Sequence, residues 1–179
     1  MKPRVYILSR APILGLAITR LASDIGKVHA HRIYKGMIAK VIKRTHDPRW
    51  EVIISGTPSK SLGEVIEWQG IRQVSQARGT LSDKLNKIFR KKGPIVVIGT
   101  DCPQLNQKDI ATAFKALKSY DTVLGPAEDG GFWLIGMNAP LKKDIFRNVR
   151  WSHKYTLSDV LLNIEGSIFH LRKLTDIDD

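Results

Sequence analysis

The chain has 179 residues, of which 42% are hydrophobic and 26% are charged. These values are ordinary for a globular protein and exclude an intrinsically disordered or collagen-like chain. No apolar run approaches the ~20 residues that a membrane-spanning helix needs. Because no linker, repeat or low-complexity segment divides the sequence, we expect a single domain over residues 1–179.

Cysteine usage and the N-terminal segment bear on location. The single cysteine, Cys102, has no partner for a disulfide within the chain. The first residues carry too short an apolar run for a secretory signal peptide. Together these features predict a protein of the reducing cytoplasm.

The charge is high and unevenly placed. The chain carries 29 Lys and Arg against 17 Asp and Glu, a formal net charge of +12. Residues 1–93 hold 19 basic and 6 acidic residues, which gives +13, whereas residues 94–179 hold 10 and 11, which gives −1. A positive electrostatic field of this kind attracts phosphorylated small molecules, nucleic acids and anionic membranes alike, so the charge does not indicate which of them the protein binds.

Strands and helices are predicted to alternate along the chain. Short apolar runs between turn residues predict strands, and apolar residues at helical spacing predict helices. The predicted strands are 4–9, 51–55, 94–99, 122–125, 132–136 and 168–171, and the predicted helices are 17–25, 28–45, one that begins at Asn106, and 155–164. This alternation predicts an α/β fold with a doubly wound, mostly parallel sheet.

The helix over 28–45 is amphipathic. Its predicted apolar stripe comprises Ile33, Met37, Ile38, Val41 and Ile42. The opposite face is basic, and we interpret it as a solvated helix face without assigning it a function.

In doubly wound sheets, ligands bind where loops leave the carboxyl ends of the strands. The first such loop runs from Ser9 and Arg10 through Ala11 to Gly15, and Thr19-Arg20 follows at the start of a predicted helix. Backbone N–H groups at a helix start, with an arginine nearby, suit a phosphate. The loop is neither a Walker A sequence nor Gly-x-Gly-x-x-Gly, so a purely structural connection remains the alternative.

Two acidic loops follow later strands. Asp101 comes directly after the predicted strand 94–99, where its carboxylate can take one coordination position on Mg²⁺, or can simply cap the turn. Asp129-Gly130-Gly131 precedes Phe132-Trp133. The two glycines permit close approach of a ligand and equally permit a β-hairpin turn, and composition does not separate these interpretations. The histidines show no metal-ligand grouping, and Cys102 is expected to be inert.

Several segments together resemble one family, the radical-SAM-associated transferases of the GT-A nucleotide-diphospho-sugar transferase superfamily. The matching segments are Ala11-Pro12 with Gly15 and Thr19-Arg20-Leu21, Gln76 with Gly79 and Leu81, Gly99-Thr-Asp-Cys-Pro-Gln-Leu105, Gly125-Pro-Ala-Glu-Asp-Gly-Gly-Phe-Trp-Leu-Ile-Gly136, and Trp151-Ser152. They span most of the chain, and the Gly-Thr-Asp-Cys-Pro and Gly-Pro-Ala-x-Asp-Gly-Gly motifs are the specific ones.

The resemblance implies a three-layer α/β fold with a nucleotide above the first strands and Mg²⁺ or Mn²⁺ held by Asp101. It implies catalytic roles for Asp101 and Asp129. The residues implied for nucleotide binding are Ser9, Arg10, Ala11, Gly15, Thr19, Arg20, Gln76, Gly79 and Thr100, and those implied for substrate binding are Gly130, Gly131 and Trp151.

Two departures from the family pattern fall near the implied nucleotide. The family has a lysine directly before Thr-Arg, where a cation neutralises charge on a transferring phosphoryl group, and this chain has Ile18. The family's Gly-Asp-Leu-Gly is here Gly79-Thr-Leu-Ser82. Either Arg10, Arg20 or Arg78 substitutes for the lysine, or the activity is reduced or altered.

The sequence therefore predicts a metal-dependent transferase that uses a nucleotide-activated donor. Transfer of a sugar from a nucleotide-sugar is favoured, because attack at phosphorus depends more strongly on the missing cation. The alternative within enzymes is a nucleotidyltransferase that releases pyrophosphate. The alternative of another class is a non-catalytic basic module that binds nucleotide or nucleic acid, although nucleic acid is the less favoured partner. The acceptor is not predicted.

Overall fold

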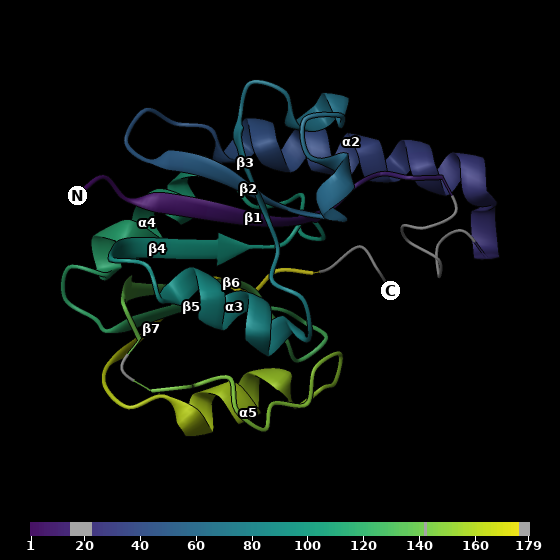
Figure 1. The fold of residues 1–179 in the computed structure, drawn as a ribbon. Helices are drawn as coiled ribbons and strands as arrows, with labels where there is room; N and C mark the ends of the chain where they lie inside the picture. The colour runs from purple at the N-terminus through teal and green to yellow at the C-terminus, as the bar shows by residue number, and fades with distance from the viewer. Residues whose placement is uncertain (15–22, 142, 176–179) are drawn as a thin grey trace.

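The computed structural model describes residues 1–14, 23–141 and 143–175. Its centre is a seven-stranded sheet with the order β3-β2-β1-β4-β6-β5-β7 (Figure 1). Within it β6 runs antiparallel to β4 and β5, and the other neighbouring strands are parallel. The strands are β1 Arg4–Arg10, β2 Glu51–Thr57, β3 Arg72–Ser75, β4 Gly93–Ile98, β5 Thr122–Pro126, β6 Phe132–Ala139 and β7 Ile168–His170.

Helices cover both faces of the sheet, which makes the predicted three-layer α/β fold. The described helices are α2 Lys27–Thr45, α3 Leu81–Phe89, α4 Gln107–Ala116 and α5 Thr156–Asn163, with short 3-10 turns at η1 Ser59–Ser61 and η2 Ile66–Trp68. The helices α2 and α4 cover one face of the sheet, and α3 and α5 cover the other (Figure 1). Their buried side chains belong to two separate core clusters, one on each face.

Successive side chains of the central strands point to opposite faces of the sheet, which explains why a separate core lies on each face. In β1, Val5 and Ile7 point to the α2–α4 side, while Tyr6 points to the α3–α5 side. All three are at most 1% exposed. Strands buried on both faces need continuous apolar runs, which is why the sequence of β4 predicts its position so well.

The predicted elements agree with the observed ones, with differences at particular residues. Ile33, assigned to the apolar stripe of α2, is 41% exposed, and the neighbouring Tyr34 is buried in its place. The predicted helix 17–25 lies mostly outside the described residues, although residues 23–25 are helical. Within the described ranges, the sequence analysis did not assign β3, α3 or the short 3-10 turns η1 and η2.

The two elements β3 and α3 differ in their local sequence signal. The strand β3 lies at the sheet edge, and its four residues are all exposed or half-buried. Because none of them is buried, the segment needs no apolar pattern and has none. The nine residues of α3 carry a helical pattern, with Leu81, Leu85, Ile88 and Phe89 at helical spacing after a capping box. No helix in the described ranges is long and apolar enough to cross a membrane.

Candidate functional site

Two adjoining pockets lie at the carboxyl-end edge of the parallel strands. The β1 pocket has a volume of about 270 Å³ and the hairpin pocket about 200 Å³. Both are lined by Leu81 and Asp101. The β1 pocket is completed by Leu8, Ser9, Arg10, Tyr34, Met37, Thr57, Gln76, Lys84 and Thr100. The hairpin pocket is completed by Gly99, Cys102, Asp129, Gly131, Phe132, Trp133, Trp151, Ser152 and Thr156.

Gln76 ties the three strands around the β1 pocket together. It follows β3, and its side-chain amide donates to the carbonyl oxygens of Ser55 in β2 and Ser9 in β1, at 2.7 and 3.3 Å. Its backbone N–H donates to the carbonyl of Gly56 at 3.1 Å. These bonds join the ends of three neighbouring strands beside the pocket.

Tyr34 brings a phenol from α2 to the same pocket. Its hydroxyl donates to the carbonyl oxygen of Arg10 at 3.0 Å. Burial is the main cause that raises the pKa of Tyr34, and the negative charge of Asp101 raises it further, while hydrogen bonds with Thr100, Arg10 and Ser9 act in the opposite direction. The phenol therefore stays protonated and acts as a donor.

Asp101 stands where β4 ends. The strand finishes at Ile98, and Gly99 and Thr100 carry the chain across the sheet edge. The hydroxyl of Thr100 donates to Oδ1 of Asp101 at 3.3 Å. A Cβ at position 99 would lie 3.3 Å from Oδ2, so glycine leaves room for the carboxylate to stand over the strand end. Asp101 is exposed and lines both pockets.

The doubled glycine forms a β-hairpin turn between β5 and β6. The N–H of Ala127 donates to the carbonyl of Gly131 at 3.0 Å, and the N–H of Gly131 donates to Oδ1 of Asp129 at 2.7 Å. Gly130 has φ +89°, and a Cβ there would overlap the carbonyl of Lys154. The hairpin interpretation is therefore confirmed, and the turn also presents Asp129 to the hairpin pocket.

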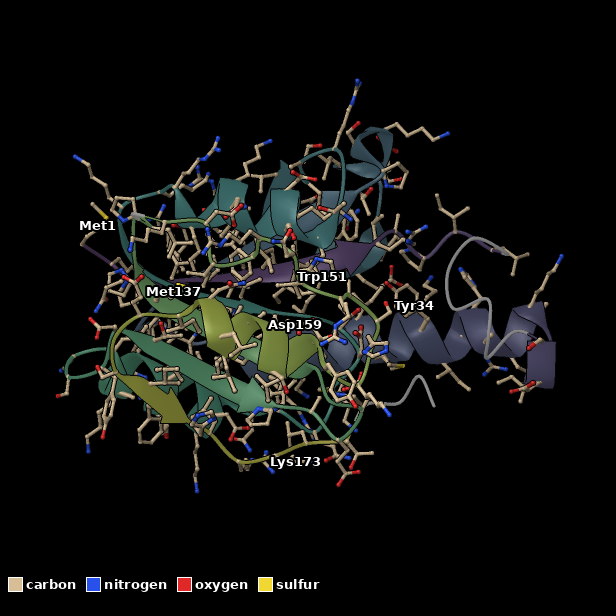
Figure 2. The ribbon with its side chains drawn as sticks, turned by 90° about the horizontal axis from the view of Figure 1, so that it is seen from below. Met1, Tyr34, Met137, Trp151, Asp159 and Lys173 are labelled. Carbon is tan, nitrogen blue, oxygen red and sulfur yellow. The ribbon has the colours of Figure 1, made fainter. Side chains whose placement is uncertain are left out.

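Aromatic rings wall the hairpin pocket. The indole N–H of Trp133 donates to the carbonyl of Arg172 at 3.1 Å, and that of Trp151 donates to Oγ of Ser82 at 2.9 Å. Phe132 and Trp151 meet edge to face with ring centroids 6.2 Å apart. Each indole is held by a hydrogen bond, so the wall is ordered as well as apolar. In Figure 2, Met1 is labelled at the left edge, Trp151 near the middle and Tyr34 to the right of Trp151.

The structure gathers most of the predicted site residues that it describes. Ser9, Arg10, Gln76, Thr100 and Asp101 line the β1 pocket, and Asp101, Asp129, Gly131 and Trp151 line the hairpin pocket.

Three predicted residues lie elsewhere. Ala11 is 1% exposed and packs in the core, with its N–H donating to the carbonyl of Thr57 at 2.7 Å. Gly79 has φ +99° in the turn before α3 and lines neither pocket, and Gly130 packs against Lys154. Gly15, Thr19 and Arg20 lie outside the described residues, as does Ile18.

Tyr34, Thr57 and Lys84 line the β1 pocket although the sequence analysis did not single them out. For Lys84 a signal was present. Thr80 and Asp83 have the spacing of a capping box, which predicts a helix from Leu81 and places Lys84 in its first turns. No comparable local signal marked Tyr34, because a buried tyrosine on a helix is ordinary core packing.

The carboxylates that line the pockets suit a divalent cation whose coordination is completed by substrate phosphates and waters. Among the described ranges no group of three or more His, Cys, Asp or Glu side chains could hold a metal by itself. Mg²⁺ typically takes one or two protein carboxylates, and substrate phosphates and waters supply its other ligands. Asp101 lines both pockets, so it supplies one carboxylate ligand of the type that such a site needs.

Solved structures with the same fold include enzymes that handle nucleotides. A candidate nucleotide-diphospho-sugar transferase from Desulfovibrio desulfuricans G20 matches 99% of this chain and 82% of its own, with TM-score 0.87 and 19% identity. A cytidylyltransferase from Leptospira borgpetersenii matches 96% and 76%, with TM-score 0.64 and 14% identity. Rv0371C from Mycobacterium tuberculosis H37Rv, in complex with manganese, matches 99% and 92%, with TM-score 0.56 and 12% identity. At these identities the likeness shows the fold alone, an α/β fold shared with the candidate nucleotide-diphospho-sugar transferase.

The family is established by the sequence itself. Residues 38–153 match the family described as an uncharacterized protein conserved in bacteria (DUF2064), and the chain belongs to that family. No curated protein matches the chain. The narrower resemblance to radical-SAM-associated members stays a prediction.

Proposed function

We propose that the chain is a metal-dependent transferase that uses a nucleotide-activated donor, with a nucleotide-sugar as the preferred donor. One observation carries the proposal. Asp101, at the carboxyl end of β4, lines two adjoining pockets of different character. The β1 pocket is polar and carries two cationic side chains, and the hairpin pocket has aromatic walls and a second carboxylate.

The β1 pocket suits the nucleotide part of the donor. Arg10 offers a guanidinium to phosphate oxygens. The protonated phenol of Tyr34 holds the carbonyl of Arg10, so it fixes the backbone from which that side chain leaves. Asp101 would hold Mg²⁺ or Mn²⁺ beside the donor phosphates. When bound, the metal would neutralise negative charge on the departing phosphate. Solved enzymes of this fold, such as the Leptospira cytidylyltransferase, use nucleotides, which supports the assignment.

The hairpin pocket suits the group that is transferred and the acceptor. In sugar transfer, the bond from the anomeric carbon to the diphosphate oxygen breaks and a bond from that carbon to an acceptor oxygen forms. The acceptor hydroxyl then loses its proton, and in the proposed reaction Asp129, which lines the hairpin pocket, accepts it. Trp151 and Phe132 offer apolar ring surface against which a sugar ring packs.

Nucleotidyl transfer is the second candidate, since one of the solved structures of this fold is a cytidylyltransferase. It differs in the bond that breaks, because pyrophosphate leaves from a nucleoside triphosphate. A pyrophosphate-release assay with each of the four triphosphates separates the two reactions. A non-catalytic basic module would instead show salt-sensitive binding to RNA or DNA that ignores nucleotides and metal.

The test is calorimetric titration of a panel of nucleotide-sugars in the presence of Mn²⁺. Replacement of Asp101 by Asn keeps the size of the side chain and removes the charge, so Mn²⁺-dependent binding is expected to weaken by about tenfold or more. Glu165→Gln is the matched control, because Glu165 is an exposed carboxylate paired with Lys143 and lines neither pocket. Equal binding by wild type and Asp101→Asn would contradict the metal assignment.

A further inference from the structure

The helix α3 carries a lysine to the β1 pocket. A capping box fixes the start of this helix, with the N–H of Thr80 donating to Oδ2 of Asp83 at 2.7 Å and the N–H of Asp83 donating to Oγ1 of Thr80 at 3.4 Å. Leu85, with 1% exposure, anchors the same turn in the core. Lys84 lies between these anchors, is half-buried and lines the pocket. Its Cα is therefore held in place while its flexible stem reaches the pocket.

The charges around the β1 pocket are unbalanced. In the part of the chain that the structure describes, its cationic lining side chains are Arg10 and Lys84, and its acidic lining side chain is Asp101. Neither cation belongs to an ion pair among the described residues, whereas Lys35 on α2 is paired with Glu67 at 3.0 Å. Two cations from different elements, β1 and α3, thus border one small pocket and suit an anion that carries more than one phosphate.

We propose that Lys84 binds the second phosphate of the donor, so that the site selects nucleoside diphosphate groups over monophosphates. This inference rests on the proposed function of the β1 pocket. An ammonium group is a compact point charge and binds phosphate oxygens without the fixed geometry that a guanidinium needs. Lys84 in this way supplies, from α3, the cation that the chain lacks before Thr19, where the sequence has Ile18.

A neighbouring lysine provides the matched control. Lys87 is on the same helix, is exposed, and lines neither pocket. A general attraction of anions to the basic half of the chain depends on both lysines to a similar degree. A specific phosphate contact depends on Lys84 alone.

The experiment measures binding of UDP, GDP, CDP and ADP, and of the matching monophosphates, by calorimetry in Mn²⁺ and at fixed ionic strength. For each diphosphate that the wild type binds, Lys84→Met is expected to weaken affinity about tenfold, the low end for loss of a charge-assisted hydrogen bond at a half-exposed site. Monophosphate affinity is expected to change less than about twofold, because that ligand lacks the second phosphate. Lys84→Arg is expected to retain diphosphate binding, and Lys87→Met to bind both ligands like the wild type. Thermal melts check that each variant is folded.

The outcomes separate this inference from the proposed function. If the wild type binds diphosphates and Lys84→Met binds them equally well, Lys84 has no such role and the nucleotide site stands. Equal losses of monophosphate and diphosphate affinity would also overturn selection at the second phosphate. If the wild type binds no nucleotide at all, the proposed function and the role of Lys84 both fall.

Discussion

Replacement of Ser82 by Ala removes one hydroxyl that joins three segments. The hydroxyl donates to the carbonyl of Phe146 at 2.8 Å and accepts the indole N–H of Trp151 at 2.9 Å. Through these two bonds the first turn of α3 holds the aromatic wall of the hairpin pocket. Alanine fits the helix and leaves both partners without this bond.

The expected magnitude follows from the two lost bonds. A typical net hydrogen bond contributes about 1 kcal/mol, and a buried partner left unsatisfied costs about 1–3 kcal/mol. Ser82 and Trp151 are half-buried, so water replaces part of what is lost and the low end applies. We expect Ser82→Ala to lower the free energy of unfolding by about 1–2 kcal/mol, which lowers Tm by about 2–8 °C in a domain of this size.

The assay is thermal unfolding followed by circular dichroism, with urea titration to obtain the free energy of unfolding. Ser59→Ala is the control, since Ser59 is exposed and lies in η1, away from both pockets. Ser82→Gly introduces the residue found in the resembled motif and is expected to cost about 1 kcal/mol more than Ala, because glycine is a poorer helix former. A Tm of Ser82→Ala within about 1 °C of the wild type would refute the anchoring role of this hydroxyl.

Two further predictions concern packing and pH. Gly125→Ala would place a Cβ 2.7 and 2.8 Å from Cζ2 and Nε1 of Trp133, and we expect this overpacking to lower the free energy of unfolding by about 1–3 kcal/mol in urea titration. In the control Gly36→Ala the new Cβ meets nothing within 4 Å, so that variant should be as stable as the wild type or more stable. Equal stabilities of the two variants would contradict this prediction. The guanidinium and backbone N–H of Arg150 donate to Asp159 and lower the pKa of that carboxyl to about 2 from its ordinary 3.8. The stabilisation of the folded state by ionised Asp159 is therefore complete above about pH 4 and is lost as the pH falls through about 2. In thermal melts from about pH 5 to 2, the Tm of the wild type should approach the Tm of Asp159→Asn. A difference in Tm that stays constant over this range would refute the linkage.

The sequence predicted the parts of the fold that depend on local pattern. The buried strand β4 is recognisable because a strand covered on both faces must be apolar throughout, and Asp101 is placed by following directly after it. A hairpin at Gly130 was one of two open interpretations, and it forms there because the turn requires positive φ, which glycine adopts without strain. The capping box before α4, made by Asn106 and Asp109, likewise marks the helix start that was predicted there.

The candidate site was predictable in its loops and not in its helices. The loop residues follow strands whose carboxyl ends meet at one edge of a parallel sheet, so Ser9 and Asp101 were expected at that edge. That β1 and β4 are neighbours, which brings these two residues to one pocket, is seen only in the structure. Tyr34 and Lys84 reach the same pocket from α2 and α3, and which helical residue does so depends on how each helix is rotated against the sheet.

The amino-acid sequence alone determined six of the seven described strands, the acidic loops and the uneven charge, because each is set by neighbours in the chain. Tertiary structure decided which residue of α2 is buried, since Tyr34 packs inward and Ile33 faces solvent at adjacent positions. It also decided that the edge segment Arg72–Ser75 becomes a strand and that Ser82 meets Trp151 across 69 positions. These contacts join residues far apart in the chain, so their energy appears only once the sheet and its helical layers have packed together.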